Sequence, residues 1–180
     1  MTRPPFAPPT DAELAVVSAQ LGREARGVVG IAARCVCGNP TVVATAPRLP
    51  DGTPFPTFYY LTHPAATAAM STLEATQVMP ELAALLDTEP DVAKAYREAH
   101  EAYVADRTLF GEVAEIDGVS AGGMPTRVKC LHALAGHALA AGPGVNPIGD
   151  EALRRSRWSP ERCECVRPGA AVRPEAAEAE

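Results

Sequence analysis

The chain has 180 residues, which is enough for one domain with a hydrophobic core and few for two. Hydrophobic residues make up 47% of it and aromatic residues only 5%, so we expect a core built mainly from aliphatic side chains. The formal net charge of −6 argues against unaided binding to nucleic acid or to an anionic membrane, because both need a cationic surface. No apolar run suits a membrane span or a signal peptide, so we expect a cytoplasmic protein.

The first third of the chain predicts one helix followed by a small sheet. Residues 1–9 are rich in proline and are expected to be a disordered lead-in. Thr10 and Glu13 match a capping box, which places a helix start there, and Gly22 ends that helix near Leu21. Runs of β-branched residues then predict a hairpin and, after a proline-rich loop, a third strand. The strands are expected over Val28–Arg34, Thr41–Thr45 and Thr57–Leu61.

The rest of the chain predicts helices. The stripe Val92, Tyr96 and Tyr103 has the period of a helix that faces a core. Helices are expected over residues 66–75, 80–86, 91–109 and 126–141, with a last short one after Asn146. The predicted fold is α+β, with a small antiparallel sheet of about three strands packed against several helices. We expect one domain over residues 10–166 and a disordered acidic tail over residues 167–180.

Thiol and imidazole side chains are the most informative chemistry in the sequence. They are the ligands that zinc and other soft or borderline metals prefer. Neither C-x-x-C nor H-x-x-x-H is present, so the spacing alone selects no standard site. The candidate donors are Cys35, Cys37, His63, Cys130, His132, His137, Cys163 and Cys165.

The predicted helix over residues 126–141 narrows this set. On such a helix Cys130 and His137 would share a face nearly two turns apart, whereas Cys130 and His132 would point about 200° apart. The helix is therefore expected to give one or two ligands. Cys35, at a strand end, and His63, at a strand-to-helix junction, are expected to give the others.

Three other interpretations of the cysteines remain open. Cys163 and Cys165 could join Cys35 and Cys37 in a four-thiolate zinc site. An iron–sulfur cluster is the variant if Cys37 or a C-terminal cysteine takes part. Free cysteines also pack in cores as small apolar residues and then carry no function.

The glycine-rich loop over residues 120–125 offers a second candidate site. Gly122 and Gly123 let the backbone approach a ligand, and a helix that starts at the end of this loop would offer free amides and a positive dipole end. Arg127 and Lys129 would add positive charge. The loop therefore predicts a small anionic ligand such as phosphate or carboxylate, although a tight turn that binds nothing needs the same glycines.

Four short motifs occur in order: Arg34–Pro40, Phe55–Pro64, Val128–His132 and Gly144–Asp150. Together they resemble the bacterial family catalogued as domain of unknown function 501, which is widespread in actinobacteria. The resemblance runs from about residue 14 to residue 153 and implies no established activity. It implies that members outside actinobacteria carry Cys at the position of His63, an exchange that a metal ligand tolerates. The ligand set that it favours is Cys35, His63, Cys130 and either His132 or His137.

We therefore predict a Cys/His metal-binding protein that holds zinc or an iron–sulfur cluster. Zinc with an open coordination position would permit hydrolytic or lyase chemistry through a bound water, so the sequence leaves enzymatic activity open. One alternative is a non-catalytic interaction or regulatory protein in which any metal is structural. The other is a binder of small anions that uses the Gly122–Gly123 loop.

Overall fold

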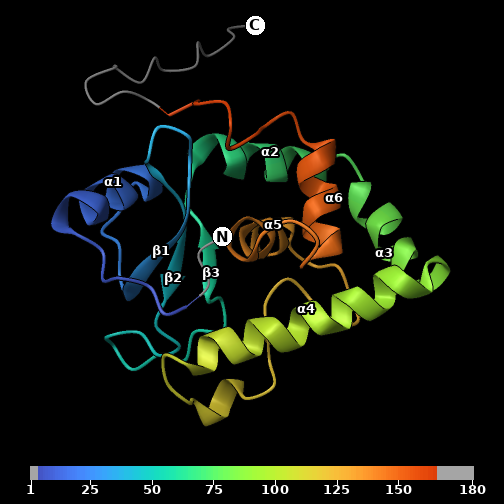
Figure 1. The fold of residues 1–180 in the computed structure, drawn as a ribbon, viewed down its shortest axis with the longest axis horizontal. Coiled ribbons are helices and arrows are strands. Elements are labelled where there is room, and N and C mark those ends of the chain that lie inside the picture. Colours follow the sequence, from blue (N-terminus) through green and yellow to red (C-terminus); the bar gives the residue numbers. More distant parts are fainter. Residues whose placement is uncertain (1–3, 166–180) are drawn as a thin grey trace, which may run out of the picture.

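A three-stranded antiparallel sheet stands against a group of helices in the computed structural model of the chain, which describes residues 4–165 (Figure 1). The predicted α+β class is confirmed, whereas the predicted acidic tail lies outside the described residues. Within residues 4–165, no helix is both long enough and apolar enough to span a bilayer. The elements are α1 (Asp11–Leu21), β1 (Val28–Arg34), β2 (Pro40–Thr45), β3 (Tyr59–Leu61), α2 (Pro64–Ala75), α3 (Val78–Thr88), α4 (Pro90–Thr108), a short 3-10 helix (Ala114–Ile116), α5 (Leu131–Ala141) and α6 (Pro147–Arg155).

The sheet is buried on both faces of its central strand. β2 lies between β1 and β3, and every one of its residues is buried. Successive side chains of a strand point to opposite faces. Val43 packs with Val17 of α1 and Ile31 of β1 in a small cluster on one face, while Val42 belongs to the larger core on the other. The sheet therefore separates α1 from the remaining helices.

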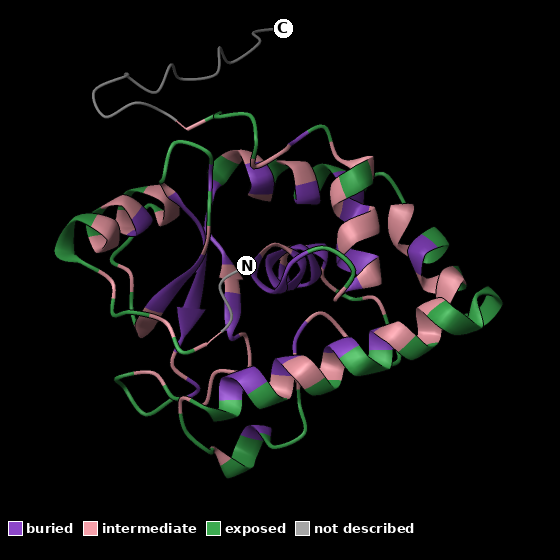
Figure 2. Ribbon diagram, in the orientation of Figure 1, coloured by how far each residue is buried: buried purple, intermediate pink, exposed green. Residues whose placement is uncertain are grey.

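Helix α5 runs through the centre of the larger core. Nine of its eleven residues are buried, and Figure 2 shows the helix buried along its length with α2, α4 and α6 around it. A helix that is apolar on all sides must be covered on all sides. Small side chains make that possible: a Cβ on Gly136 would lie only 3.2 Å from the carbonyl oxygen of Tyr59, so β3 lies directly on the helix backbone.

Helix α6 contacts α5 just as closely at Gly149. A Cβ on Gly149 would overlap the carbonyl oxygen of Leu134 and lie 2.8 Å from its carbonyl carbon and 2.9 Å from the Cβ of Ala138. Asn146 caps α6 and accepts a hydrogen bond from the amide of Gly149 at 2.9 Å. The Asn146-to-Gly149 motif thus sets both the start of α6 and its distance from α5.

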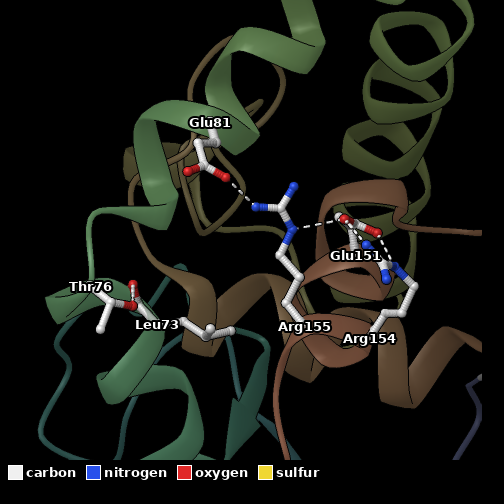
Figure 3. Close-up of polar contacts among 6 residues, drawn as sticks. All are labelled: Leu73, Thr76, Glu81, Glu151, Arg154 and Arg155. Atoms are coloured by element: carbon white, nitrogen blue, oxygen red, sulfur yellow. Dashed lines mark hydrogen bonds and ion pairs between the residues drawn. The ribbon is translucent and has the colours of Figure 1, made fainter.

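An ion-pair network on the outer side of α6 reaches α3 (Figure 3). Arg155 donates from Nε to Glu151 at 2.8 Å and from Nη1 to Glu81 of α3 at 2.6 Å. Arg154 donates to the same Glu151 at 2.6 Å. The hydrogen bonds from Arg154 and then Arg155 lower the pKa of Glu151 to about 2.

The predicted start of the helix after the glycine-rich loop is wrong. α5 begins at Leu131 rather than Thr126. The residues before it form a loop whose amides bind carbonyl oxygens of the same loop, as when Lys129 donates to Gly122 at 2.8 Å. Cys130 is consequently the N-cap of α5, with an extended backbone at φ −149° and ψ 108°.

Within the described part of the N-terminal segment, residues 4–9, the side chain of Phe6 packs against the fold. Phe6 is half-buried and stacks on Phe110, with 6.1 Å between the ring centroids. It also fills the space where Gly30 of β1 has no side chain. A single aromatic residue among prolines carries no periodic pattern, so this contact could not be predicted from the sequence.

Gly149→Ala tests the contact between α5 and α6. Alanine normally stabilises a helix interior over glycine by about 0.5–1 kcal/mol. Here the new Cβ has no space, so we expect the free energy of unfolding to fall by about 1–3 kcal/mol. Urea denaturation followed by circular dichroism measures the change, and a variant as stable as the parent chain would contradict the close contact.

Glu151→Gln tests the network of Figure 3 through its pH dependence. Because the pKa of Glu151 is lowered from 4.5 to about 2, its contribution to stability is fully present above pH 4.5 and is lost as the pH falls toward 2. We expect the variant to lose about 1 kcal/mol or less at neutral pH, as is usual for pairs near the surface. The two chains should become equally stable at the acid end of urea titrations, and a constant difference would contradict this.

Candidate metal centre

The turn between β1 and β2 presents two cysteines. Cys35 donates its amide to the carbonyl oxygen of Asn39 at 2.9 Å, and Gly38 donates back to the carbonyl oxygen of Cys35 at 2.8 Å. Gly38 has a φ of +89°, a conformation that favours glycine. Cys35 is buried beneath the turn and Cys37 is exposed.

The segment after α6 brings two further cysteines to this turn. It runs back over α2 toward the β1–β2 hairpin (Figure 1). Two contacts fix its course: the amide of Val36 donates to the carbonyl oxygen of Pro160 at 3.0 Å, and the buried ring of Trp158 lies 5.4 Å from the ring of His63. Cys163 and Cys165 follow immediately.

The four sulfur atoms converge. Those of Cys35, Cys37, Cys163 and Cys165 all lie within 4.8 Å of one another, and the sulfurs of Cys37 and Cys165 are 3.4 Å apart. Four thiolates bound to one tetrahedral zinc ion, with bonds of about 2.3 Å, have their sulfurs about 3.8 Å apart. The cluster therefore has the dimensions of a site for a single ion.

The surroundings shift the thiol pKa values of Cys35, Cys37 and Cys165 in different directions. The backbone amide of Asn39 is the largest cause that lowers the pKa of the Cys37 thiol, to about 7. Burial raises the pKa of the Cys35 and Cys165 thiols. Thiolates this close repel one another, so a cation is needed for all four to ionise together.

His63 lies beside the cluster. It is fully buried at the N-cap of α2, where its Nδ1 accepts a hydrogen bond from the amide of Ala66 at 3.4 Å. The proton of the neutral ring is then on Nε2, which lies 3.2 Å from the sulfur of Cys165 and donates to it. Burial lowers the pKa of His63, which keeps the ring neutral.

A second group of donor atoms lies where α2 meets the N-terminus of α5. Glu74, Cys130 and His132 place one carboxylate oxygen, the sulfur and one ring nitrogen within 4.8 Å of one another. His132 Nδ1 is 3.2 Å from Oε1 of Glu74 and 3.9 Å from Sγ of Cys130. The contact with Cys130 is the largest cause that raises the pKa of His132, and it also lowers the pKa of the Cys130 thiol.

His137 belongs to neither group. It is buried in the core, stacked on Tyr59 with 5.4 Å between the ring centroids, and Tyr103 meets it edge-on. Its Nδ1 lies 3.2 Å from the side-chain amide of Asn146. This histidine joins the sheet to the α6 cap.

The structure thus divides the ligand set predicted from the sequence. Cys35 and His63 lie at the first cluster, whereas Cys130 and His132 lie at the second. Cys130 and His132 would point apart only if both were helical. Since Cys130 is the extended N-cap, its sulfur can approach the His132 ring.

Several donor residues in these two groups lie outside the ligand set that the sequence favoured. Cys163 and Cys165 were only an alternative, because their segment carries no helix or strand pattern. Glu74 was missed, although a signal exists: Thr67, Ser71 and Glu74 are spaced by four and three residues and form a polar stripe on α2.

The anion site predicted at the glycine-rich loop depended on a helix that starts at the end of this loop, but α5 begins only at Leu131. Gly122 instead has its φ at +73° and packs against Leu134, whose Cδ2 would lie 2.5 Å from an added Cβ. The amide of Arg127 donates to the carbonyl oxygen of Gly123 at 2.9 Å, and the side chains of Arg127 and Lys129 are exposed. The loop is built as a tight packing turn.

Comparison with known proteins places the chain in one family. No curated protein and no solved structure gave a significant match. The family match covers more than half of the chain and agrees with the resemblance carried by the four sequence motifs. The chain belongs to the family described as "Protein of unknown function (DUF501)", whose model matches residues 31–154.

Proposed function

We propose that the protein is a metal-binding protein that holds one zinc ion between Cys35, Cys37, Cys163 and Cys165. The observation that carries this proposal is the convergence of the four sulfurs within 4.8 Å, from two segments that are far apart in the sequence. Free cysteines that only fill a core have no reason to gather in this way, and two of these are exposed.

The dimensions favour a single ion over an iron–sulfur cluster. In a cluster the four cysteines bind two or more iron atoms, so some of their sulfurs stand farther apart than the edge of one tetrahedron. Here each sulfur is within reach of one central ion. Among the common metals, a tetrahedral set of four thiolates is typical of zinc.

Four protein ligands leave no open position, so this ion is structural. It ties the β1–β2 turn to the segment after α6, which otherwise contacts the turn through the Val36–Pro160 hydrogen bond. His63 supports it by donating to the Cys165 sulfur, as hydrogen-bonded neighbours of metal ligands do. Thiolate ligands persist in a reducing compartment, which agrees with the cytoplasmic location expected from the sequence.

The double substitution Cys163→Ser/Cys165→Ser tests this proposal. The purified full chain should lose one equivalent of zinc, measured by elemental analysis, together with the strong thiolate charge-transfer absorption of the cobalt-substituted protein. With free zinc at about a hundred times the dissociation constant, the ion should add about 2.7 kcal/mol to the free energy of unfolding, and the variant should lack this gain.

Cys130→Ser is the matched control, because it removes a thiol that lies outside the four-sulfur cluster. It should keep the four-thiolate cobalt spectrum. Amide exchange adds a local readout: chelation should speed exchange at the amide of Val36, which pairs with Pro160. A double variant that retains the spectrum and the metal would refute the site.

A further inference from the structure

The group formed by Glu74, Cys130 and His132 brings three donor atoms of different chemistry within 4.8 Å of one another. Nε2 of His132 lies 3.2 Å from the carbonyl oxygen of Thr67, which can only accept, so this nitrogen carries a proton. Ser71 Oγ lies 3.1 Å from the same nitrogen. In the neutral ring the lone pair is therefore on Nδ1, on the side of the carboxylate and the sulfur.

Three electron-rich atoms consequently face one another. Nδ1 of His132 is 3.2 Å from Oε1 of Glu74 and 3.9 Å from Sγ of Cys130. A backbone amide holds the carboxylate in place, since Leu131 donates to Oε1 of Glu74 at 2.7 Å. A divalent ion between the three atoms would stabilise this arrangement in the place that a proton takes in the His132–Glu74 ion pair.

We propose that Glu74, Cys130 and His132 bind a second divalent ion of the zinc class, with the fourth coordination position open to solvent. Tetrahedral zinc with one oxygen, one nitrogen and one sulfur ligand separates these atoms by about 3.3–3.6 Å. The two distances from His132 Nδ1, 3.2 Å to Glu74 and 3.9 Å to Cys130, lie close to these values. The bond from His132 Nε2 to a backbone carbonyl is the usual support for an imidazole ligand.

The open position distinguishes this centre from the four-cysteine site. The side chains of His132 and Glu74 are 26% and 29% exposed, so water can reach the ion. Three protein ligands with one water are the arrangement of catalytic zinc, in which the metal lowers the pKa of the water. All three ligands also lie inside residues 31–154, the segment that the family model matches, whereas Cys163 and Cys165 lie beyond it.

Metal stoichiometry in a background without the first site tests the proposal. The full chain carrying Cys163→Ser/Cys165→Ser should still bind one equivalent of cobalt(II) or zinc. Its cobalt complex should show charge transfer from a single thiolate, much weaker than that of four. Adding Cys130→Ser or His132→Ala should abolish the binding. Ser71→Ala should weaken it about tenfold without changing the stoichiometry, because it removes only a support of the ring.

His100→Ala is the control for loss of a histidine, since His100 lies on α4 and contacts Ser120 instead. It should bind as the background chain does. If Cys130→Ser or His132→Ala does not fold, Glu74→Gln replaces it, because the amide oxygen can still accept from Leu131 while serving poorly as a ligand; it should weaken metal binding at least tenfold.

The proposal is overturned if the background chain binds no metal, or if Cys130→Ser, His132→Ala and Glu74→Gln all bind it unchanged. It is also overturned if His132 proves doubly protonated in the presence of saturating zinc, since a proton on Nδ1 then occupies the place of the metal ion. These outcomes are separate from those of the first site. Failure of the four-cysteine site appears as unchanged metal content when Cys163 and Cys165 are replaced in the parent chain.

Discussion

The burial of nine of the eleven residues of α5 is the constraint on which the rest of the structure depends. A helix without an exposed face can be enclosed only if its neighbours reach its backbone, and Gly136 and Gly149 are the points where β3 and α6 do so. That contact fixes the direction of α6 and hence the path of the segment that follows it. The N-terminus of α5 meets α2 by the same packing, which brings Cys130 and Glu74 together.

The sequence predicted the elements well where a local pattern decides them. The capping box at Thr10, the β-branched hairpin and Pro64 at the start of α2 each act within a few residues, and each is present in the structure. The predicted start of α5 is wrong because amides of the preceding loop donate to carbonyl oxygens of the same loop. These hydrogen bonds depend on the positive φ angles of Gly122 and Gly123. The hydrophobic periodicity of the sequence does not show where this loop ends and α5 begins.

The candidate sites show the same difference between local features, which can be predicted from the sequence, and long-range contacts, which cannot. Residue type identified Cys35, Cys130 and His132 as candidate metal donors, because thiol and imidazole chemistry can be read from the chain itself. Their partners could not be assigned, because that depends on where the segment after α6 runs. One N-cap residue in the extended conformation also decides whether Cys130 faces His132 or points away from it. Helical geometry applied from residue 126 turned Cys130 away from His132, whose Nδ1 lies 3.9 Å from the Cys130 sulfur in the structure.

The distance of 3.4 Å between the sulfurs of Cys37 and Cys165 has a consequence for redox chemistry. A disulfide needs about 2.05 Å between its sulfurs, so a shift of little more than one ångström would join them. In the proposed site, bound zinc would occupy the electron pairs that an oxidant attacks, and its removal would leave Cys37 with a thiol pKa lowered to about 7. Oxidation of the metal-free chain would therefore replace an ionic tie between the hairpin and the C-terminal segment with a covalent one. Only a reductant, and not zinc alone, would then restore the site.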